Sequence, residues 1–417
     1  MKQSPRTVIG LLAVAVLTAA VAAADWNAAV AAYRAHRWQD AARELGAVLE
    51  RHPDYAPGHY LLGLVRLQLG DHEGGVTELR RAAELDPARP QYAVGLVQAL
   101  VTAGQAEEAL KVAEGIGLDG LTKDQRTLLA LLEARAALRV KEPARAVPAV
   151  RGALEAMPDS APLYHALGSL VEASGDLGGA FDADVRSFEL DPRPDSRAGM
   201  RALDLAHALA ARAGDAGARQ AVYRRAMAVA RKLVEGSEDP AVLHAAGRVA
   251  LGAGEAETAT GWLGAAGKKR PADPQLAYDL GRAEAAAGDE EAAYTTLARA
   301  LTLSPDKNLA RRVHLRMARL DTHRLRLDAA IEHFRAAGEA DRAEKLRTTA
   351  KGLEEAEAQR RRLAARIHKL ESARERLQEL GDTDGVTATT RELDTLKKDL
   401  AETEKNLEEV RAGLERL

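Results

Sequence analysis

A period of 34 residues constrains what this chain can fold into more than any other feature of its 417 residues. Prolines stand 34 residues apart in three pairs: Pro53 and Pro87, Pro158 and Pro192, and Pro271 and Pro305. Two pairs of glycines have the same separation: Gly70 and Gly104, and Gly254 and Gly288. Both residue types interrupt helices, and a shared period in such residues is the signature of a repeat architecture.

Each period predicts two helices. Between residues 59 and 87, apolar residues recur at helical spacing as far as Gly70 and Asp71, and a second helical pattern then runs to Pro87. Aromatic residues make up only 3% of the chain, which is therefore poor in sheet-forming residues. A glycine inside the first helix, such as Gly63 or Gly281, predicts a place where two helices approach closely.

These prolines, glycines and small residues resemble those of the tetratricopeptide repeat (TPR) family. The resemblance implies an all-α fold, a superhelical solenoid of about nine helix–turn–helix repeats over residues 25–338. The segment between Arg193 and Pro240 is about eleven residues longer than the other units. It predicts either an extended second helix or a bend in the array.

The pattern changes to heptads in residues 339–417. Two leucine-rich seams flank a break at Gly381–Gly385, which predicts an antiparallel coiled-coil hairpin. Arg360 and Arg374 interrupt the first seam. The alternative is that these helices pair between chains and form an oligomer.

The N-terminus has the three parts of an export signal. Lys2 and Arg6 precede 17 apolar residues that end in small residues at Ala24. We expect residues 1–24 to be a cleaved signal peptide or, alternatively, an N-terminal membrane anchor. Both predict an exported protein, periplasmic or anchored in the inner membrane facing the periplasm. The chain has no cysteine, so it is not expected to be a lipoprotein.

Composition and motifs argue against an enzyme. Without cysteine there is no thiolate metal site or cysteine nucleophile, and a net charge of −3 does not favour nucleic-acid binding. Gly115–Gly120 matches the letters of a dinucleotide-binding loop but follows a helix instead of a strand. Asp382–Gly385 lacks the carboxylate ligands of a calcium loop at both ends. We predict no catalytic residue, no cofactor and no metal site.

The family resemblance implies that first helices line a binding groove. It places the following partner-binding candidates there: Trp26, Tyr33, Tyr60, Leu64, Gln98, Arg135, Arg139, His165, His244, Arg248, Tyr278, Arg282, Arg319 and His323. The recurrence of arginine at one repeat position, as in Arg248 and Arg282, favours carboxylate-bearing partners. The alternative is that these arginines pair with acidic residues of adjacent helices, and that Trp26 and Tyr33 cap the core of the first repeat.

The sequence thus predicts an exported scaffold or adaptor that holds a segment of a partner protein during cell-envelope assembly or secretion, and it favours an acidic segment. Contact with a membrane is expected only through an uncleaved N-terminus. Two alternatives are an assembly factor tethered to the inner membrane and a regulatory accessory subunit of an envelope enzyme.

Overall fold

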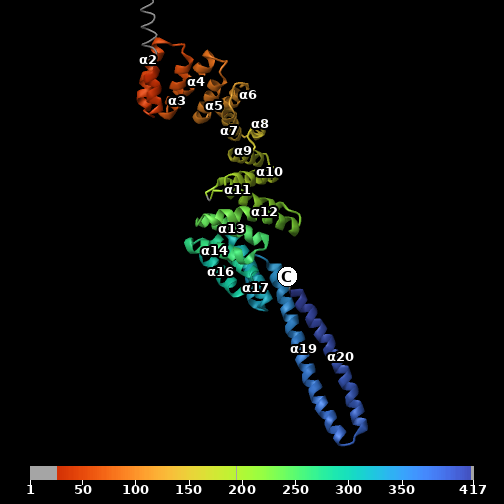
Figure 1. Cartoon of the computed structure of the whole chain (residues 1–417). Coiled ribbons are helices and arrows are strands. Elements are labelled where there is room, and N and C mark those ends of the chain that lie inside the picture. Colours follow the sequence, from red (N-terminus) through yellow and green to blue (C-terminus); the bar gives the residue numbers. More distant parts are fainter. Residues whose placement is uncertain (1–25, 194, 415–417) are drawn as a thin grey trace, which may run out of the picture. The chain divides into compact units, whose positions relative to one another are not determined.

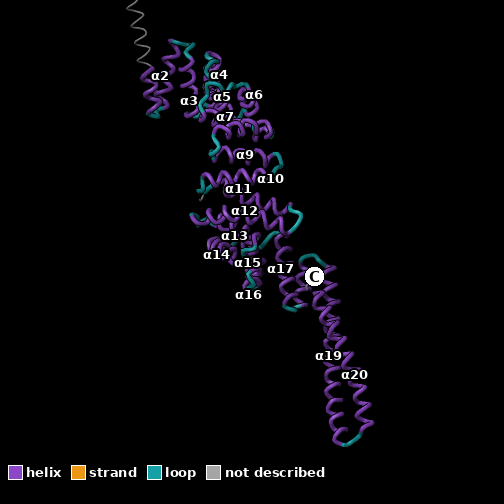
Figure 2. The backbone as a smooth tube through the Cα atoms, turned by 45° about the vertical axis from the view of Figure 1, so that its right-hand side comes forward, coloured by secondary structure: helices purple, strands orange, loops and turns teal. Residues whose placement is uncertain are grey.

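The structure is a computed structural model that describes residues 26–193 and 195–414. Within these ranges the chain forms helices joined by turns and loops, without a strand (Figure 2). The predicted signal peptide, residues 1–24, lies outside the described residues. None of the described helices combines the length and the apolar character needed to cross a membrane.

Residues 26–338 form nine consecutive helix pairs among the described residues, as the repeat pattern predicted. The chain divides into two compact units, one ending at Ser237 and the other beginning at Glu238. In the first unit the pairs are residues 26–34 with α2 (Trp38–Arg51), α3 (Ala56–Gln68) with α4 (His72–Leu85), α5 (Pro90–Ala103) with α6 (Ala106–Glu114), α7 (Lys123–Val140) with α8 (Val147–Ala156), α9 (Ala161–Ala173) with α10 (Leu177–Leu190), and α11 (Arg197–Arg212) with α12 (Ala216–Glu235). A short 3₁₀ turn, η1 (Pro143–Arg145), precedes α8. In the second unit they are α13 (Pro240–Ala253) with α14 (Ala256–Lys269), α15 (Pro274–Ala286) with α16 (Glu290–Thr302), and α17 (Lys307–His323) with α18 (Leu327–Ala336).

A glycine–aspartate pair makes the turn inside several repeats. Gly70 has a φ of 83°, a left-handed conformation that suits glycine and lets the chain leave α3. Asp71 then caps α4, because its carboxylate accepts a hydrogen bond from the backbone N–H of Gly74 at 2.9 Å. Asp176 and Asp289 cap α10 and α16 in the same way. The periodic letters of the sequence therefore correspond to helix ends.

The recurring glycines inside first helices reflect close helix packing within their hairpins. A Cβ atom added to Gly281 would lie 2.8 Å from Cγ of Leu297 on α16. Gly63 and Gly247 face Leu79 and Leu263, which likewise follow the glycine by sixteen residues. These contacts support the interface predicted from the small residues.

The long repeat between Arg193 and Pro240 was predicted to contain either an extended second helix or a bend. Its second helix, α12, has 20 residues, whereas the second helices α10 and α14 have 14 each. The second helix is therefore extended by six residues, as one of the two readings predicted, and takes up about half of the additional length.

The two last helices, α19 (Ala340–Glu379) and α20 (Thr383–Leu414), pack side by side within one chain (Figure 1). Ile367, Leu393 and Leu396 form one part of their apolar seam. Near the base, Leu353 and Leu407 share a core with Phe334 of α18, so the hairpin continues the packing of the last repeat. The predicted break is shorter than expected, since Thr383–Gly385 already belong to α20 and the carboxylate of Asp382 caps this helix.

Candidate functional site

The aromatic candidates of the first repeat cover its apolar core. Trp26 makes an edge contact with Tyr55, with ring centroids 5.2 Å apart, and Tyr33 makes another with Trp38 at 5.6 Å. Trp26 and Tyr33 both pack against the buried cluster of this repeat. Their geometry favours the capping role that the sequence left as an alternative.

Tyr60, Leu64 and Gln98 lie on the next first helices, α3 and α5. The ring of Tyr60 is 4.9 Å from that of Tyr92, and Leu64 packs against the core that these helices share. Burial, followed by the neighbouring phenols of Tyr33 and Tyr92, raises the pKa of Tyr60. All three residues are half-buried, so they contribute mainly to packing between repeats.

Arg135 and Arg139 on α7 differ in their surroundings. Arg139 donates a hydrogen bond to the carbonyl oxygen of Val101 at 3.2 Å, near the C-terminal end of α5, where a positive charge is favourable. Arg135 is exposed and makes no hydrogen bond or ion pair with the described residues. Arg139 also lines a hollow with Glu107 and Glu108, so it lies beside acidic residues and not beside other basic candidates.

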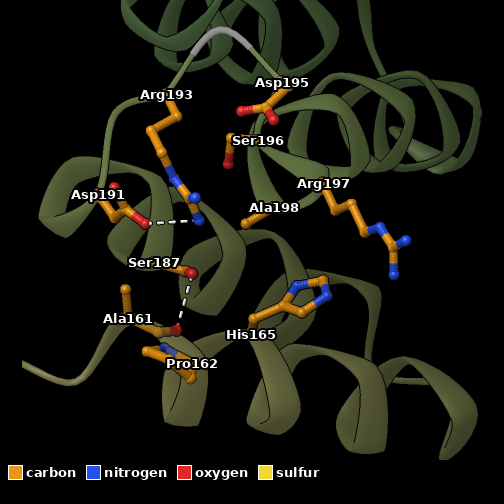
Figure 3. Close-up of a pocket in the computed structure, with 10 residues that line it drawn as sticks. All are labelled: Ala161, Pro162, His165, Ser187, Asp191, Arg193, Asp195, Ser196, Arg197 and Ala198. Carbon is orange, nitrogen blue, oxygen red and sulfur yellow. Dashed lines mark hydrogen bonds and ion pairs between the residues drawn. The ribbon is translucent and has the colours of Figure 1, made fainter.

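A hollow of about 350 Å³, here called the first hollow, lies among α9, α10 and the start of α11 (Figure 3). Its charged lining is balanced, because Asp191 and Asp195 accompany Arg193 and Arg197. Figure 3 shows Arg193 paired with Asp191, and their nearest charged atoms are 2.8 Å apart.

His165 lies on the α9 wall of the first hollow (Figure 3). Its Nδ1 is 2.9 Å from Oδ1 of Asp184, a fully buried carboxylate on α10. Arg201 approaches the other oxygen of Asp184 to 3.3 Å, without the geometry of a hydrogen bond. Burial raises the pKa of Asp184 even though His165 and Arg201 act to lower it.

A second hollow, also of about 350 Å³, lies in the other unit and is bordered mainly by three first helices, α13, α15 and α17. Arg282, Arg316, Arg319 and His323 supply its basic side chains, and Glu290 supplies its only carboxylate among the lining residues. Three arginines against one glutamate leave this second hollow with a net charge of +2 when histidine is neutral.

Beside the second hollow, several candidate residues converge on Asp279 of α15, which is 1% exposed. Nε2 of His244 lies 3.0 Å and Nη1 of Arg282 lies 3.1 Å from its carboxylate. Nε of Arg248 is more distant, at 3.9 Å. Burial alone would raise the pKa of Asp279, but hydrogen bonds from His244 and Gln275, with the charge of Arg282, hold it below the usual value. Arg248 thus has an acidic partner on an adjacent helix, as the alternative reading required, whereas Arg282 pairs with an aspartate of its own helix.

Arg316 and Arg319 have no such partner. Neither makes a hydrogen bond or an ion pair with any described residue. Burial, with the nearby charges of Arg282 and Arg319, lowers the pKa of the half-buried Arg316. Like charges close together raise one another's energy, so an anion in this hollow would be stabilised.

The sequence analysis missed Arg316 and Asp279. On α17, basic residues recur with helical spacing in the set Arg312, Arg316, Arg319 and His323. This stripe could have been found from the sequence, because residues three and four apart share a helix face. Arg312 and Arg282 both lie over the ring of Tyr278, at 5.0 and 5.6 Å.

The candidates therefore separate into groups. His244, Arg248, Tyr278, Arg282, Arg319 and His323 gather in or beside the second hollow. The other candidates lie in the first unit and form no common site with one another. Across residues 26–193 and 195–414 there is no cluster of side chains suited to hold a metal ion.

A sequence profile of the tetratricopeptide repeat matches residues 27–90 and 60–116. No curated protein matches this sequence.

Several solved structures resemble parts of the chain. A tetratricopeptide repeat protein from Parabacteroides merdae is 14% identical, with a TM-score of 0.41 over 67% of this chain and 98% of that one. PilW, titled a widely conserved type IV pilus biogenesis factor, is 15% identical, with a TM-score of 0.40 over 52% and 97% of the two chains. MamA from Desulfovibrio magneticus is 17% identical, with a TM-score of 0.35 over 43% and 95%.

Proposed function

Because this chain is a member of the tetratricopeptide-repeat family, we propose that it is a scaffold that holds a segment of a partner protein against the first helices α13, α15 and α17. Repeat arrays bind partners through the extended surface that successive first helices create. Members of this family are generally scaffolds without catalytic activity.

The observation that carries the proposal is the pair of unpartnered arginines, Arg316 and Arg319, in the second hollow. A guanidinium group binds a carboxylate through two parallel hydrogen bonds. Leu251 and Leu320 add apolar surface to the same hollow. This combination suits an acidic peptide segment with aliphatic side chains.

We further propose that the scaffold works outside the cytoplasm, in envelope assembly or secretion. The support is the basic, apolar and small-residue order of residues 1–24. An anchored assembly factor would keep this segment, whereas a periplasmic adaptor would lose it. Sequencing the N-terminus of the protein recovered from fractionated cells distinguishes the two. Recovery in the cytoplasmic fraction alone would rule out export.

Photo-crosslinking tests the binding surface. A photoreactive amino acid replaces Ala286, an exposed residue on the lining of the second hollow, in the full-length chain in living cells. The control places the same group at Thr295, an exposed residue of α16 that does not line the hollow. We expect a discrete adduct from position 286 only, and weaker crosslinking when Arg316 and Arg319 are changed to Gln. Equal adducts from both positions would contradict the proposal.

A further inference from the structure

The charges around the second hollow are unequally neutralised. Arg282 shares the carboxylate of Asp279, and Glu290 lies 2.9 Å from Arg324, outside the hollow lining. His323 approaches the other oxygen of Glu290 to 3.6 Å. Once these pairs are set aside, the guanidinium groups of Arg316 and Arg319 have no counter-charge among residues 26–193 and 195–414.

Two negative charges would neutralise the half-buried Arg316 and the exposed Arg319 together. A single carboxylate would leave one guanidinium group unneutralised beside the half-buried Arg316. A phosphorylated side chain carries about two charges at neutral pH and three acceptor oxygens. Two neighbouring acidic side chains offer the same charge with four oxygens. Both fit the fork geometry of arginine.

We propose that the second hollow binds a doubly charged anionic group of a peptide, either a phosphorylated side chain or two adjacent carboxylates, in preference to a single carboxylate. The inference rests on the proposed peptide-binding function and specifies the chemistry of the bound segment. Arg316 and Arg319 bind the anion, and Arg282 flanks it while paired with Asp279.

Glu290 lowers the net positive charge of the hollow and so weakens its attraction for anions. It occupies the first turn of α16, where a carboxylate is stabilised by the helix N-terminus, and Arg324 holds it in place. Replacing it by Gln raises the net charge of the lining from +2 to +3. The Glu290→Gln variant should therefore bind every anionic probe more tightly, with the largest gain for the most highly charged one.

Chemical modification of arginine in the full chain tests the anion site. Phenylglyoxal is applied at about pH 8, and modified residues are mapped by mass spectrometry. At equal ionic strength, inorganic phosphate should slow the modification of Arg316 and Arg319 at least about threefold more than acetate does, because phosphate is mostly a dianion at this pH. Arg135, exposed and unpaired in the other unit, is the matched control and should react at the same rate in both salts. Equal protection by acetate and phosphate would overturn the proposal.

Three labelled peptides then distinguish the sources of the charge. They share one aliphatic sequence and carry a single Glu, a Glu–Glu pair or a phosphoserine at the centre. By fluorescence anisotropy we expect at least one doubly charged peptide to bind about tenfold or more tightly than the single-Glu peptide, which corresponds to about 1.4 kcal/mol. The variant with Arg316→Gln and Arg319→Gln should lose this difference while its circular dichroism stays unchanged.

The failures of the two proposals are distinguishable. Crosslinking from position 286 together with equal binding of all three peptides would leave the scaffold in place and refute the requirement for two charges. Protection by phosphate without binding of any peptide would refute a peptide ligand and assign the hollow to a free anion. Loss of both crosslinking and phosphate protection would refute both proposals.

Discussion

The first and second hollows have the same volume, about 350 Å³, but the charged lining of the first is balanced and that of the second is basic. In the first, two aspartates accompany two arginines along the described lining, and Arg193 pairs with Asp191. In the second, three arginines accompany one glutamate, and two of the arginines, Arg316 and Arg319, have no partner in the described part of the chain. Helical hairpins thus create hollows of similar size in different places. The side chains on them decide whether a hollow can attract a ligand.

The buried aspartate beside each hollow shows the same contrast. Asp184 follows Gly168 by sixteen residues, at the place where Leu79, Leu263 and Leu297 fill the helix interface of other repeats. It is therefore a carboxylate at a position suited to an apolar residue, and burial raises its pKa. Asp279 instead lies on a first helix, within reach of donors from α13 and α15, and its pKa is lowered. Position within the repeat decides whether a buried acid is stabilised.

The largest effect is expected from Asp279→Leu. The change removes the acceptor of His244 and Gln275 and leaves the charges of Arg248 and Arg282 opposed by no carboxylate. It should lower the free energy of unfolding by about 2–4 kcal/mol, measured by urea denaturation. Asp159→Asn, at an exposed ion pair, is the control and should change it by less than about 1 kcal/mol. A stable Asp279→Leu variant would show that the convergence on Asp279 contributes little.

Glu133 on α7 is a third buried acid to compare with Asp184 and Asp279. Unlike them, it forms no ion pair with a basic side chain of the described residues. Burial, followed by the nearby charge of Glu114, raises its pKa to about 7. Because the pKa of Glu133 is raised on folding, its protonated form favours the folded state. This contribution to the free energy of unfolding is fully present below the unfolded-state pKa, about 4.5, and is lost as the pH rises through about 7.

Glu133→Gln should therefore stabilise the protein at pH 8.5, by at most about 3 kcal/mol, and have little effect near pH 5. Urea denaturation at the two pH values measures the difference. Glu155→Gln, at an exposed position of α8, serves as control. The same gain at both pH values would mean that ionisation of Glu133 is not its cause.

Gly281→Leu tests the contact between Gly281 and Leu297. In the other unit Asp184 takes the position of this leucine, facing Gly168. The added side chain would meet Leu297 and the backbone oxygen of Ala293, at 2.8 and 3.2 Å from the position of Cβ. It should cost about 1–3 kcal/mol, seen as a lower melting temperature. Gly261→Leu on α14, where an added Cβ meets nothing within 4 Å, is the matched control. Equal melting temperatures for the two variants would place the close contact elsewhere.

The smallest effect, with the opposite sign to that of Asp279→Leu, is expected from Asp184→Leu. Leucine restores the residue type of the other repeats, and Arg201 keeps Glu172 as a partner at 2.5 Å. The variant should gain about 1–2 kcal/mol in free energy of unfolding, because leucine replaces a desolvated carboxylate in an apolar helix interface. Destabilisation would show that the pair of His165 and Asp184 holds the repeat together, and the contrast between the two aspartates would then be lost.

The regular parts of the fold were predictable because they depend on local chemistry. Gly70 and Asp71 end one helix and cap the next through their own backbone and side-chain preferences, so their recurrence marks the repeat. Gly281 predicted a close helix contact from its position in the repeat, and the structure identifies Leu297 as its neighbour. The length of α12, by contrast, could not be predicted uniquely, because either an extended helix or a bend could accommodate the additional residues.

The candidate site was predictable only in part. Arg282, Arg319 and His323 were selected by position, but Arg316, on the same stripe of α17, was missed. Sequence spacing could not separate Arg248 from Arg319, whereas Asp279 and Arg282 have the three-residue spacing of neighbours on one helix face. Pairing depends on which carboxylate another helix brings within about 4 Å, and Asp279 lies 31 residues from Arg248.

The sequence by itself determined the helical hairpins, their number and their turns, because capping, periodicity and backbone freedom act over a few residues. The tertiary structure alone decided which charges remain unneutralised. Coulombic and desolvation energies depend on distances between side chains of different helices, and these distances are set only when the repeats pack. Asp279 meets Arg248 only because α15 packs beside α13, and Arg316 has no ion pair with the described residues for the same kind of reason.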